Sequence, residues 1–323
     1  MSAVQHTGGM SSFGFSSTTD DVLDGIDLSG QVAVVTGAST GLGEETTRTL
    51  AAHGAEVVMA VRDTGRGEAA ADRIRSTVGD DARLEVRPLD LASLASVRTF
   101  ATDMLTDRPQ INLLINNAGL MACPYGTTDD GFELQFGTNH LGHFLLGTLL
   151  APALVAGAPS RLISLSSRGH AFADVDLDDP GFEHTKYDPF RAYGRSKTAN
   201  ALFAIAFEHR YGGDSVHAWS VHPGGIHTEL GRHMTAETIA ALRSRMESEG
   251  RTFNWKSIPQ GAATTVWGAT SDEVLHRGGA YLEDCGVAKV NDDAALERGV
   301  RSYAQDLDRA EALWSLSERM VGD

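Results

Sequence analysis

The sequence has few cysteines and a deficit of basic side chains, and each shortage excludes a class of protein. Its 323 residues include two cysteines, Cys123 and Cys285, which cannot form the disulfide framework of a small secreted domain and instead fit a reducing cytoplasm. Lysines and arginines number 27 against 43 aspartates and glutamates, so the net charge is −16. That charge repels the phosphates of nucleic acids and anionic membrane surfaces. We therefore expect neither as a partner.

Targeting and membrane-spanning signals are also missing from the sequence. It contains no run of 18 apolar residues of the kind that crosses a bilayer. Residues 1 to about 20 are rich in Ser, Thr and Gly, and lack the basic and apolar regions of a secretory signal. We interpret residues 1–27 as a flexible extension, with a short helix from Asp20 to Leu28. These absences predict a cytoplasmic protein.

Short β-branched runs alternate with helical patterns through the rest of the chain. We expect seven strands, near residues 31–36, 55–61, 84–87, 111–115, 162–165, 216–221 and 280–282. Helical patterns lie between them, at about residues 44–53, 65–78, 93–106, 134–155 and 191–210. This rhythm predicts an α/β fold, a doubly wound (Rossmann) parallel sheet of about seven strands with helices on both faces. The length alone suggests about two domains, but no linker-like break follows residue 30, so we expect residues 28–323 to form one.

A glycine-rich turn joins the first predicted strand to the helix that follows it. The turn reads Gly37-Ala38-Ser39-Thr40-Gly41-Leu42-Gly43 and comes directly after the strand from Gln31 to Thr36. Glycines at such a turn let the backbone approach a diphosphate, whose charge lies at the helix N-terminus. No Gly-Lys-Ser/Thr follows, which excludes a P-loop. A tight left-handed turn without a ligand is the alternative, but the strand before it and the helix after it favour dinucleotide binding.

Tyr193 and Lys197 lie in the predicted helix at residues 191–210. Their spacing places the phenol and the amine on one helical face, one turn apart. A tyrosine with an ordinary pKa near 10 is a poor proton shuttle at neutral pH, and a nearby ammonium would lower that pKa. The pair therefore suits proton transfer to or from an alcohol or ketone oxygen. Alone the pattern is weak, because it often occurs by chance.

The other motifs all follow predicted strands, where a parallel sheet binds its ligands. They are the glycine turn, Arg62, Asp90, Asn116-Asn117-Ala118-Gly119, Ser166-Ser167 and Pro223-Gly224. Because the carboxyl ends of parallel strands meet at one edge, we expect all of these groups to reach a single crevice. That coherence is stronger than any single motif.

Three motifs together resemble the short-chain dehydrogenase/reductase family. They are Thr-Gly-x-x-x-Gly-x-Gly from Thr36, Asn-Asn-Ala-Gly from Asn116 and Tyr-x-x-x-Lys from Tyr193, and the resemblance covers about residues 28–290. Residues 136–146 (Phe-Gly-Thr-Asn-His-Leu-Gly-His-Phe-Leu-Leu) and 278–281 (Gly-Gly-Ala-Tyr) resemble one branch in particular. That branch holds the retinol dehydrogenases, the WW-domain oxidoreductase and the light-dependent protochlorophyllide reductases. The gap of 26 residues between Ser167 and Tyr193 also fits it.

The resemblance implies roles for four side chains at a catalytic centre. Tyr193 would be the general acid/base, and Lys197 would bond the nicotinamide ribose and lower the Tyr193 pKa. Ser167 would donate a hydrogen bond to the substrate oxygen, with Ser166 as the other candidate. Asn139 would support a proton-relay water near the lysine. Without the resemblance, Ser167 reads as a strand-end cap and Asn139 as a helix-kink residue.

The resemblance also implies cofactor contacts along the strand ends. Asn117, Ala118 and Gly119 would line the adenosine ribose, and Asp90 would bond the adenine amino group, although a bare aspartate is more often a helix cap. Pro223, Gly224 and Thr228, which follow the sixth strand, would contact the nicotinamide carboxamide. The full predicted set is Gly37, Ser39, Thr40, Gly41, Leu42, Gly43, Arg62, Asp90, Leu91, Asn117, Ala118, Gly119, Tyr193, Lys197, Pro223, Gly224 and Thr228.

The choice between NAD and NADP depends on the end of the second strand. NAD enzymes place an acid there to bond the ribose hydroxyls, whereas this chain has Val61 followed by Arg62. A guanidinium can pair with a 2′-phosphate, so NADP is favoured and NAD remains possible. Two features oppose this choice: the glycine turn contains no Lys or Arg, and Glu44 follows it where relatives often have a lysine.

The sequence thus predicts an oxidoreductase that moves a hydride between a nicotinamide cofactor and a small-molecule alcohol or carbonyl. Alternatives are an NAD-dependent alcohol dehydrogenase, a reductase of carbon–carbon double bonds, and a dinucleotide sensor without turnover. We expect a substrate lid at about residues 225–258, containing Met234, Met246, Phe253 and Trp255. Assembly through the helices at 134–155 and 189–211 would give a homodimer or homotetramer.

We expect no metal site, although several histidines lie close together in the sequence. His140 and His143 lie on a core helix beside Leu and Phe, so we interpret them as packing residues. His217, His222 and His227 lack a nearby set of acids and cysteines that would complete a zinc site.

Overall fold

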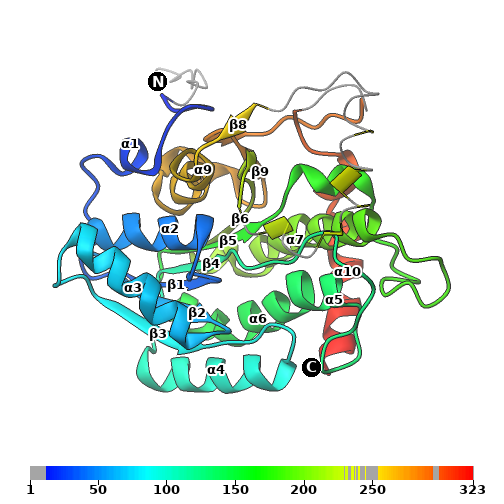
Figure 1. Ribbon diagram of the computed structural model, residues 1–323, viewed down its shortest axis with the longest axis horizontal. Helices are drawn as coiled ribbons and strands as arrows, with labels where there is room; N and C mark the ends of the chain where they lie inside the picture. Colours follow the sequence, from blue (N-terminus) through cyan, green and yellow to red (C-terminus); the bar gives the residue numbers. More distant parts are fainter. Residues whose placement is uncertain are drawn as a thin grey trace, which may run out of the picture.

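One eight-stranded sheet carries the fold (Figure 1), with the strand order β10-β9-β6-β5-β4-β1-β2-β3. The computed structural model describes residues 12–228, 230–231, 234–235, 237, 239–240, 244, 254–293 and 298–322. The strands of the sheet are β1 (Val32–Thr36), β2 (Glu56–Val61), β3 (Leu84–Pro88), β4 (Leu113–Asn116), β5 (Ser160–Leu165), β6 (Val216–His222), β9 (Tyr281–Glu283) and β10 (Gly286–Val287). All pairs are parallel except β10 with β9.

The predicted α/β fold with a doubly wound sheet is confirmed, and the seven predicted strands are present. The eighth strand, β10, has two residues, too few to give a periodic signal. From β1 the chain builds outward to β2 and β3, then returns to β4 on the other side and continues to β5 and β6. The direction of winding therefore reverses between β1 and β4, which makes the carboxyl ends of these two strands the expected ligand crevice.

Helices cover both faces of the sheet and divide the core in two. On one face lie α1 (Thr19–Leu23), α2 (Gly41–Ala52), α3 (Thr64–Val78) and α9 (Ile258–Thr270). On the other lie α4 (Leu94–Asp107), α5 (Leu134–Phe136), α6 (Gly142–Ala156), α7 (Pro189–Tyr211) and α10 (Leu307–Val321) (Figure 1). Short 3₁₀ turns are η2 (Arg168–Phe172), η3 (Gly212–Asp214), η5 (Asp272–Arg277) and η6 (Ser302–Gln305).

The predicted long helix at residues 134–155 is interrupted. Between α5 and α6 lies a π-helical turn, η1 (Gly137–Leu141), in which the Gly142 N–H bonds the Gly137 carbonyl five residues back. Such turns occur often at functional sites, and this one contains Asn139. The segment Leu134–Ala156 is long and apolar enough to cross a membrane, contrary to the expectation from sequence, but 72% of its most apolar stretch is buried against the sheet and neighbouring helices. It is a core helix.

The described part of the N-terminal segment differs from a flexible extension. Thr18 and Asp21 form a capping box that starts α1. Val22 and Leu23 are buried on the α9 side of the core, and Leu28 is buried with them. Residues 18–28 are therefore packed against the domain, because three apolar side chains find a place there. Residues 1–11 of the predicted extension lie outside the described residues.

The predicted lid at residues 225–258 falls largely outside the described residues, including Met246 and Phe253. Its two ends pair as a small parallel ladder of β7 (Gly225–Ile226) and β8 (Trp255–Lys256).

The C-terminal helix α10 covers the helices through which we expected the chain to assemble. The Trp314 ring contacts Phe144 of α6 and both Phe203 and Phe207 of α7, with ring centroids 4.9–6.4 Å apart. Arg210 stacks on the same ring at 3.9 Å and makes a bidentate ion pair with Glu311, 2.7 Å at each contact. A homo-oligomer would therefore have to displace α10 or use another surface. The oligomeric state stays a prediction.

Replacing Trp314 with alanine should detach α10 from this cluster. We expect the free energy of unfolding to fall by about 3–5 kcal/mol, the usual loss for a buried Trp, because Trp314 is 4% exposed. Chemical denaturation measures the change. Leu307→Ala on the same helix is the control, since Leu307 is 42% exposed and should change the stability by about 0.5 kcal/mol or less. Equal losses in the two variants would contradict the role given to α10.

Candidate active site

The glycine turn has the shape of a cradle for a diphosphate. Gly37 and Gly41 have φ angles of +66° and +58°, which L side chains rarely adopt. A Cβ at Gly43 would collide with the Gly37 carbonyl oxygen. Thr40 is the N-cap of α2 but makes no side-chain capping bond, so no side chain at the cap accepts from the first N–H groups of the helix. The turn therefore offers bare backbone and free donors to an anionic group.

Thr36 ties the end of β1 to the end of β4. Its hydroxyl oxygen accepts the backbone N–H groups of Asn117 at 2.9 Å and Ala118 at 3.0 Å. Asn117 returns a bond from its side-chain nitrogen to the Thr36 carbonyl oxygen at 2.8 Å. The predicted ribose-lining residues are thus held at the point where the winding of the sheet reverses. Sequence reasoning treated Thr36 as a strand residue and missed this function, although its place at the start of the motif was a signal.

Residues after β6 form a further wall of the crevice. Gly224 has a φ angle of +96°, and its N–H donates to His222 Nδ1 at 3.3 Å. A Cβ at Gly41 would lie 3.6 Å from Cγ2 of Thr228, so Thr228 faces the glycine turn. Of the predicted contacts Pro223, Gly224 and Thr228, Thr228 is the one that lies beside the cradle.

Tyr193 and Lys197 lie in the first half of α7, which begins where the Asp188 side chain accepts two backbone N–H groups. Both side chains are buried, each 3% exposed. Lys197 Nζ donates to the Leu165 carbonyl oxygen at 2.8 Å and lies 5.7 Å from the Tyr193 ring centroid. A Cβ at Gly119 would lie 3.5 Å from Nζ, so the amine borders the Asn-Asn-Ala-Gly turn. The helix thus brings phenol and amine to the edge of the crevice together.

The predicted lowering of the Tyr193 pKa is not found in the structure. Burial raises the pKa of Tyr193 to about 12, and a hydrogen bond from Ser167 offsets only part of that rise. Burial also lowers the pKa of Lys197 to about 7. The physical reason is desolvation: the phenolate and the ammonium both lose water in this pocket, so burial disfavours the charged form of each. Ser167, rather than Lys197, contacts the phenol here.

The two candidate serines that follow β5 have different hydrogen-bond partners. Ser166 is buried, and its hydroxyl donates to the Lys197 carbonyl oxygen at 2.7 Å, which fixes α7 on the sheet. Ser167 caps η2 by accepting the Gly169 N–H at 3.0 Å, and it also bonds Tyr193. Ser167 is therefore both the strand-end cap and the candidate active-site serine. Of the two, Ser167 is the one beside the phenol.

Asn139 is fixed inside the π-helical turn. Its side-chain oxygen accepts the Leu120 N–H at 2.8 Å, and its nitrogen donates to the Leu120 carbonyl and to Ser196 Oγ, at 2.9 Å each. Ser196 in turn donates to the Tyr193 carbonyl oxygen at 2.8 Å. These hydrogen bonds join the loop after β4, the π-helical turn η1 and the helix α7. Asn139 therefore belongs to the same cluster as Tyr193 and Lys197.

The residues predicted for the adenosine end differ in their exposure to solvent. Arg62 is exposed directly after β2. One carboxylate oxygen of Asp90 accepts the Ala92 N–H at 2.9 Å, which makes it a turn cap as well as a candidate adenine contact. Leu91 is buried beside α6, since a Cβ at Gly142 would meet its backbone. Leu42 packs beside α9 and Ser39 lies at the tip of the glycine turn.

The acidic residue that opposed NADP is neutralised by a distant arginine. Arg73 of α3 makes a bidentate ion pair with Glu44, 2.8 Å at each contact, and its guanidinium lies 3.5 Å from the Ser39 carbonyl oxygen. The pair borders a pocket of about 480 Å³ beside Thr40 and Gly41. A second cation therefore stands at the glycine turn. Sequence reasoning missed it because 29 residues separate Arg73 from Glu44.

Comparison with known proteins decides the family. A family model described as short chain dehydrogenase matches residues 31–238. The chain belongs to the short-chain dehydrogenase/reductase family. It is 42% identical over 304 residues to a short-chain dehydrogenase/reductase, prx1, of Penicillium roqueforti, covering 92% of this chain and 87% of that one. It is 39% identical over 307 residues to human retinol dehydrogenase 14, covering 91% and 87%.

A solved structure extends this likeness to the whole fold of the dehydrogenase. A crystal structure of a protein from Mycobacterium paratuberculosis matches with a TM-score of 0.71 at 35% identity, over 95% of this chain and 98% of that one. The predicted membership in the retinol dehydrogenase-like branch is confirmed by these relatives. The chain is thus an NAD(P)-dependent oxidoreductase of this family.

The histidines of this short-chain dehydrogenase serve different purposes. His140 is packed among Phe136, Phe144 and Phe203 with ring centroids 5.1–6.3 Å away, as predicted. His143 is buried in the core as predicted, and its ring also hydrogen-bonds Thr36 and the Asn139 carbonyl, at 2.9 Å each, which the sequence did not indicate.

The three histidines around β6 do not gather. His217 pairs with Glu208 at 3.0 Å, His222 accepts backbone N–H groups, and His227 stacks on Trp255. Within the described ranges, no group of three or more His, Cys, Asp or Glu side chains is placed to hold a metal ion.

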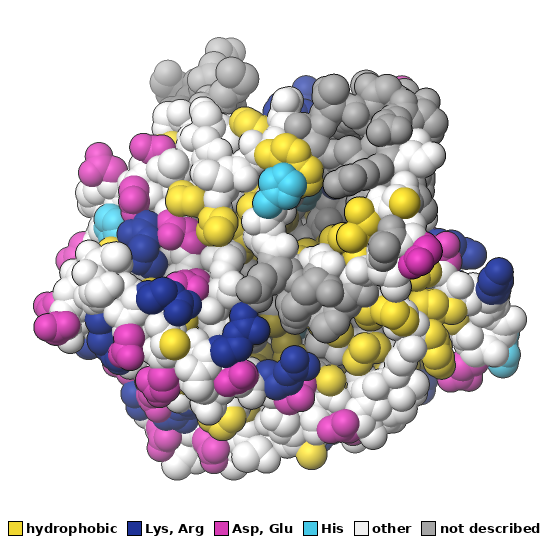
Figure 2. Space-filling model, in the orientation of Figure 1, with side chains coloured by type: hydrophobic (Ala, Val, Ile, Leu, Met, Phe, Trp, Pro, Cys, Tyr) yellow, Lys and Arg dark blue, Asp and Glu magenta, His cyan; other side chains and the backbone are white. Residues whose placement is uncertain are grey.

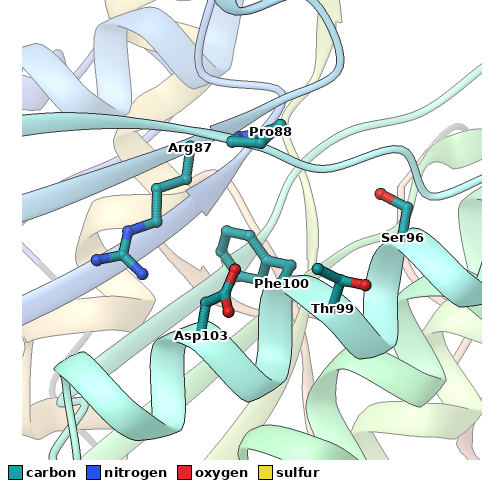
Figure 3. A pocket seen from close by; sticks show the side chains of 6 residues that line it. All are labelled: Arg87, Pro88, Ser96, Thr99, Phe100 and Asp103. Atoms are coloured by element: carbon teal, nitrogen blue, oxygen red, sulfur yellow. The ribbon is translucent and has the colours of Figure 1, made fainter.

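Charged and hydrophobic side chains are unevenly spread over the visible face of the dehydrogenase. Figure 2 shows charged side chains of both signs interspersed over the side that carries α2, α3 and α4, and hydrophobic side chains at the centre and right of the view. A separate pocket of about 190 Å³ lies between β3 and α4 (Figure 3) and is lined by Arg87, Pro88, Ser96, Thr99, Phe100 and Asp103. Arg87 is already paired with Glu85 and Asp107, and the lining contains none of the predicted site residues, so the chemistry does not lie there.

Proposed function

We propose that this dehydrogenase interconverts an alcohol and a carbonyl compound with NADP(H), and that Tyr193 is the proton donor and acceptor. The observation that carries the proposal is the meeting of the Tyr193 phenol, the Ser167 hydroxyl and the Lys197 amine at the crevice beside the glycine cradle. A bound nicotinamide supplies or accepts the hydride. Atoms balance in reduction: the carbonyl carbon gains the hydride and the carbonyl oxygen gains the phenol proton.

The electrostatics of the pocket support these roles. Because burial raises the pKa of Tyr193 to about 12, the phenol keeps its proton at neutral pH and can donate it to a developing alkoxide. Ser167 would donate its hydroxyl proton to the same oxygen and orient it. Lys197, with a pKa lowered to about 7 by burial, can exchange a proton near neutrality. In the oxidation direction the phenol would have to lose its proton, and a protonated Lys197 would stabilise the phenolate.

Two cations support the choice of NADP over NAD. Arg62 is exposed at the end of β2, where no acid is present to bond ribose hydroxyls. Arg73 neutralises Glu44 at the glycine turn, which removes the repulsion that a 2′-phosphate would meet. The competing proposal, an NAD-dependent dehydrogenase, predicts that neither arginine affects cofactor binding.

We expect Arg62→Ala to weaken NADPH about 10- to 100-fold and NADH less than about twofold, because a charge-assisted bond to the 2′-phosphate is lost. Calorimetry with 2′,5′-ADP and 5′-ADP measures the same effect without turnover. Arg319→Ala, which removes an exposed arginine of α10, is the matched control and should change neither constant. Equal weakening of both nucleotides by Arg62→Ala would reject the proposed preference.

The substrate is tested by a screen of alcohols, aldehydes and ketones with each cofactor, followed by absorbance of the reduced nicotinamide. Turnover of a carbonyl substrate supports the proposal. Turnover confined to conjugated carbon–carbon double bonds would favour the reductase alternative, and tight NADPH binding without any turnover would favour a sensor. A cytoplasmic location and a homo-oligomeric state remain part of the proposal, and cell fractionation and light scattering test them.

A further inference from the structure

His143 bridges two parts of the active site that sequence spacing does not connect. The imidazole is 1% exposed and lies at the start of α6. Its Nε2 lies 2.9 Å from Thr36 Oγ1 at the end of β1. Its Nδ1 lies 2.9 Å from the Asn139 backbone carbonyl oxygen in the π-helical turn. One ring thus contacts the group that organises the cofactor crevice and the group predicted to support the proton relay.

The partners of His143 determine where its proton lies. A carbonyl oxygen can only accept, so the proton of a neutral imidazole must lie on Nδ1, facing Asn139. Nε2 is then an acceptor. Thr36 Oγ1 already accepts two N–H groups, from Asn117 and Ala118, so its own proton is free to be donated. The Nε2 atom at 2.9 Å is a nearer acceptor than the Ile115 carbonyl at 3.4 Å. Every donor and acceptor in this group is therefore satisfied by one arrangement.

The two hydrogen bonds of His143 act on different parts of the active site. The Thr36 hydroxyl orients the backbone of Asn117 and Ala118, which border the cofactor crevice. The Asn139 carbonyl lies in the π-helical turn. The Asn139 side chain is joined to α7 through Ser196, which bonds the Tyr193 carbonyl oxygen. Neutrality of the ring is secured mainly by burial: the pKa of His143 is lowered to about 4, because burial and the nearby Lys197 outweigh the hydrogen bond to the Asn139 carbonyl, which raises it.

We propose that neutral His143 is a positioning residue that fixes the Thr36–Asn117 turn through Nε2 and the Asn139 carbonyl through Nδ1. One side chain would then set both the affinity for the dinucleotide and the path of proton transfer. The inference rests on the proposed function, because the second role has meaning only if Tyr193 and Lys197 exchange a proton.

Two substitutions separate the two bonds. Asparagine places an amide near the position of Nδ1, so His143→Asn keeps a donor toward the Asn139 carbonyl and loses the acceptor for Thr36. Glutamine reaches the position of Nε2, so His143→Gln keeps an acceptor for Thr36 and loses the donor toward Asn139. His140→Asn and His140→Gln are matched controls, since His140 is a histidine of the same helical segment, equally buried, that contacts an aromatic cluster and Ser317 instead.

We expect the variants to separate cofactor affinity from turnover. His143→Asn should raise the dissociation constant for NADP⁺ about tenfold, with the pH profile of kcat unchanged, because one buried hydrogen bond is lost. His143→Gln should bind NADP⁺ within about twofold of the wild type, lower kcat about tenfold and shift its pH profile. Neither His140 variant should produce this separation. Parallel changes in affinity and kcat for both His143 variants, matching those of His140, would overturn the inference.

Nitrogen NMR of the wild-type protein gives a test that needs no variant to fold. His143 should show a protonated Nδ1 and an unprotonated Nε2 from pH 6 to 8, with or without NADP⁺. A proton on Nε2 or a charged ring at pH 7 would overturn the inference. If the wild type turns over no alcohol or carbonyl compound, the proposed function fails, whereas the cofactor affinities and the NMR signals still decide the position of the His143 proton.

Discussion

Tyr193→Phe is expected to lower kcat about 10³-fold while leaving the dissociation constant for NADPH within about twofold of the wild-type value. The substitution removes one oxygen and keeps the ring, which is 3% exposed and packed against Gly169. The lost oxygen is the one that Ser167 contacts, so the proton has no donor and the developing alkoxide has one partner fewer. Single-turnover kinetics at the reduced-nicotinamide band, together with calorimetric binding of NADPH, measure the two quantities.

The matched control for Tyr193 is Tyr125→Phe. Tyr125 is 56% exposed and contacts Tyr187 by its ring, so its hydroxyl has no part in the proposed chemistry and kcat should stay within about twofold. Ser167→Ala should lower kcat in the same direction as Tyr193→Phe. Retained turnover in Tyr193→Phe would remove the proposed acid/base and would require the proton to come from another group.

Mild acid should destabilise the folded protein steeply, because burial holds four histidines neutral. Burial is the main cause that lowers the pKa of His140 and His222 to about 3 and those of His143 and His170 to about 4. Their pKa in the unfolded chain is near 6.5. Between about pH 6.5 and pH 4 the unfolded state therefore binds more protons than the folded state, so stability falls as the pH falls through this window. Above pH 6.5 the contribution is fully present.

The expected slope is up to about 5 kcal/mol per pH unit near pH 5.5, because each of the four histidines contributes at most about 1.4 kcal/mol. Burial raises the pKa of Glu133 and Glu283, so these carboxyls take up protons in the folded state and offset part of the loss at the acid end. Urea denaturation at intervals from pH 8 to pH 4.5 measures the slope. His140→Phe should reduce the slope by about a quarter, because it removes one of the four groups. A stability that is constant from pH 7 to pH 5 would contradict the neutral, buried state of these rings.

Local patterns predicted most of the fold because they report local physics. The strands were found from β-branched runs, and α7 from the helical run at residues 191–210. The glycine turn was expected to let the backbone approach a diphosphate, and Gly37 and Gly41 have positive φ. Two helices were not predicted although their signals were present: α9 begins with the capping box of Ser257 and Gln260, and α10 begins at Asp306 and ends at Gly322 in a left-handed conformation. Capping chemistry would have located both.

Other features depend on contacts between residues far apart in the chain. The coverage of α6 and α7 by Trp314, and the ion pair that neutralises Glu44 with Arg73, follow from the packing of one helix on another. The bond between His143 and Thr36 is of the same kind, since 107 residues separate the two, whereas the bond to the Asn139 carbonyl spans only four residues. A pattern over a few neighbours carries no information on such pairs.

The sequence by itself determined the chemical groups of this dehydrogenase and the strand ends that carry them, because motif spacing and residue type are properties of the chain. Only the tertiary structure decided how those groups are charged. The Tyr193 pKa rises rather than falls because burial removes water from the phenolate, and the amount of water removed depends on every element packed around the ring. Likewise, the Nδ1 proton of His143 faces the nearby Asn139 carbonyl oxygen, but only the fold brings the Thr36 hydroxyl, 107 residues away in the chain, within 2.9 Å of Nε2.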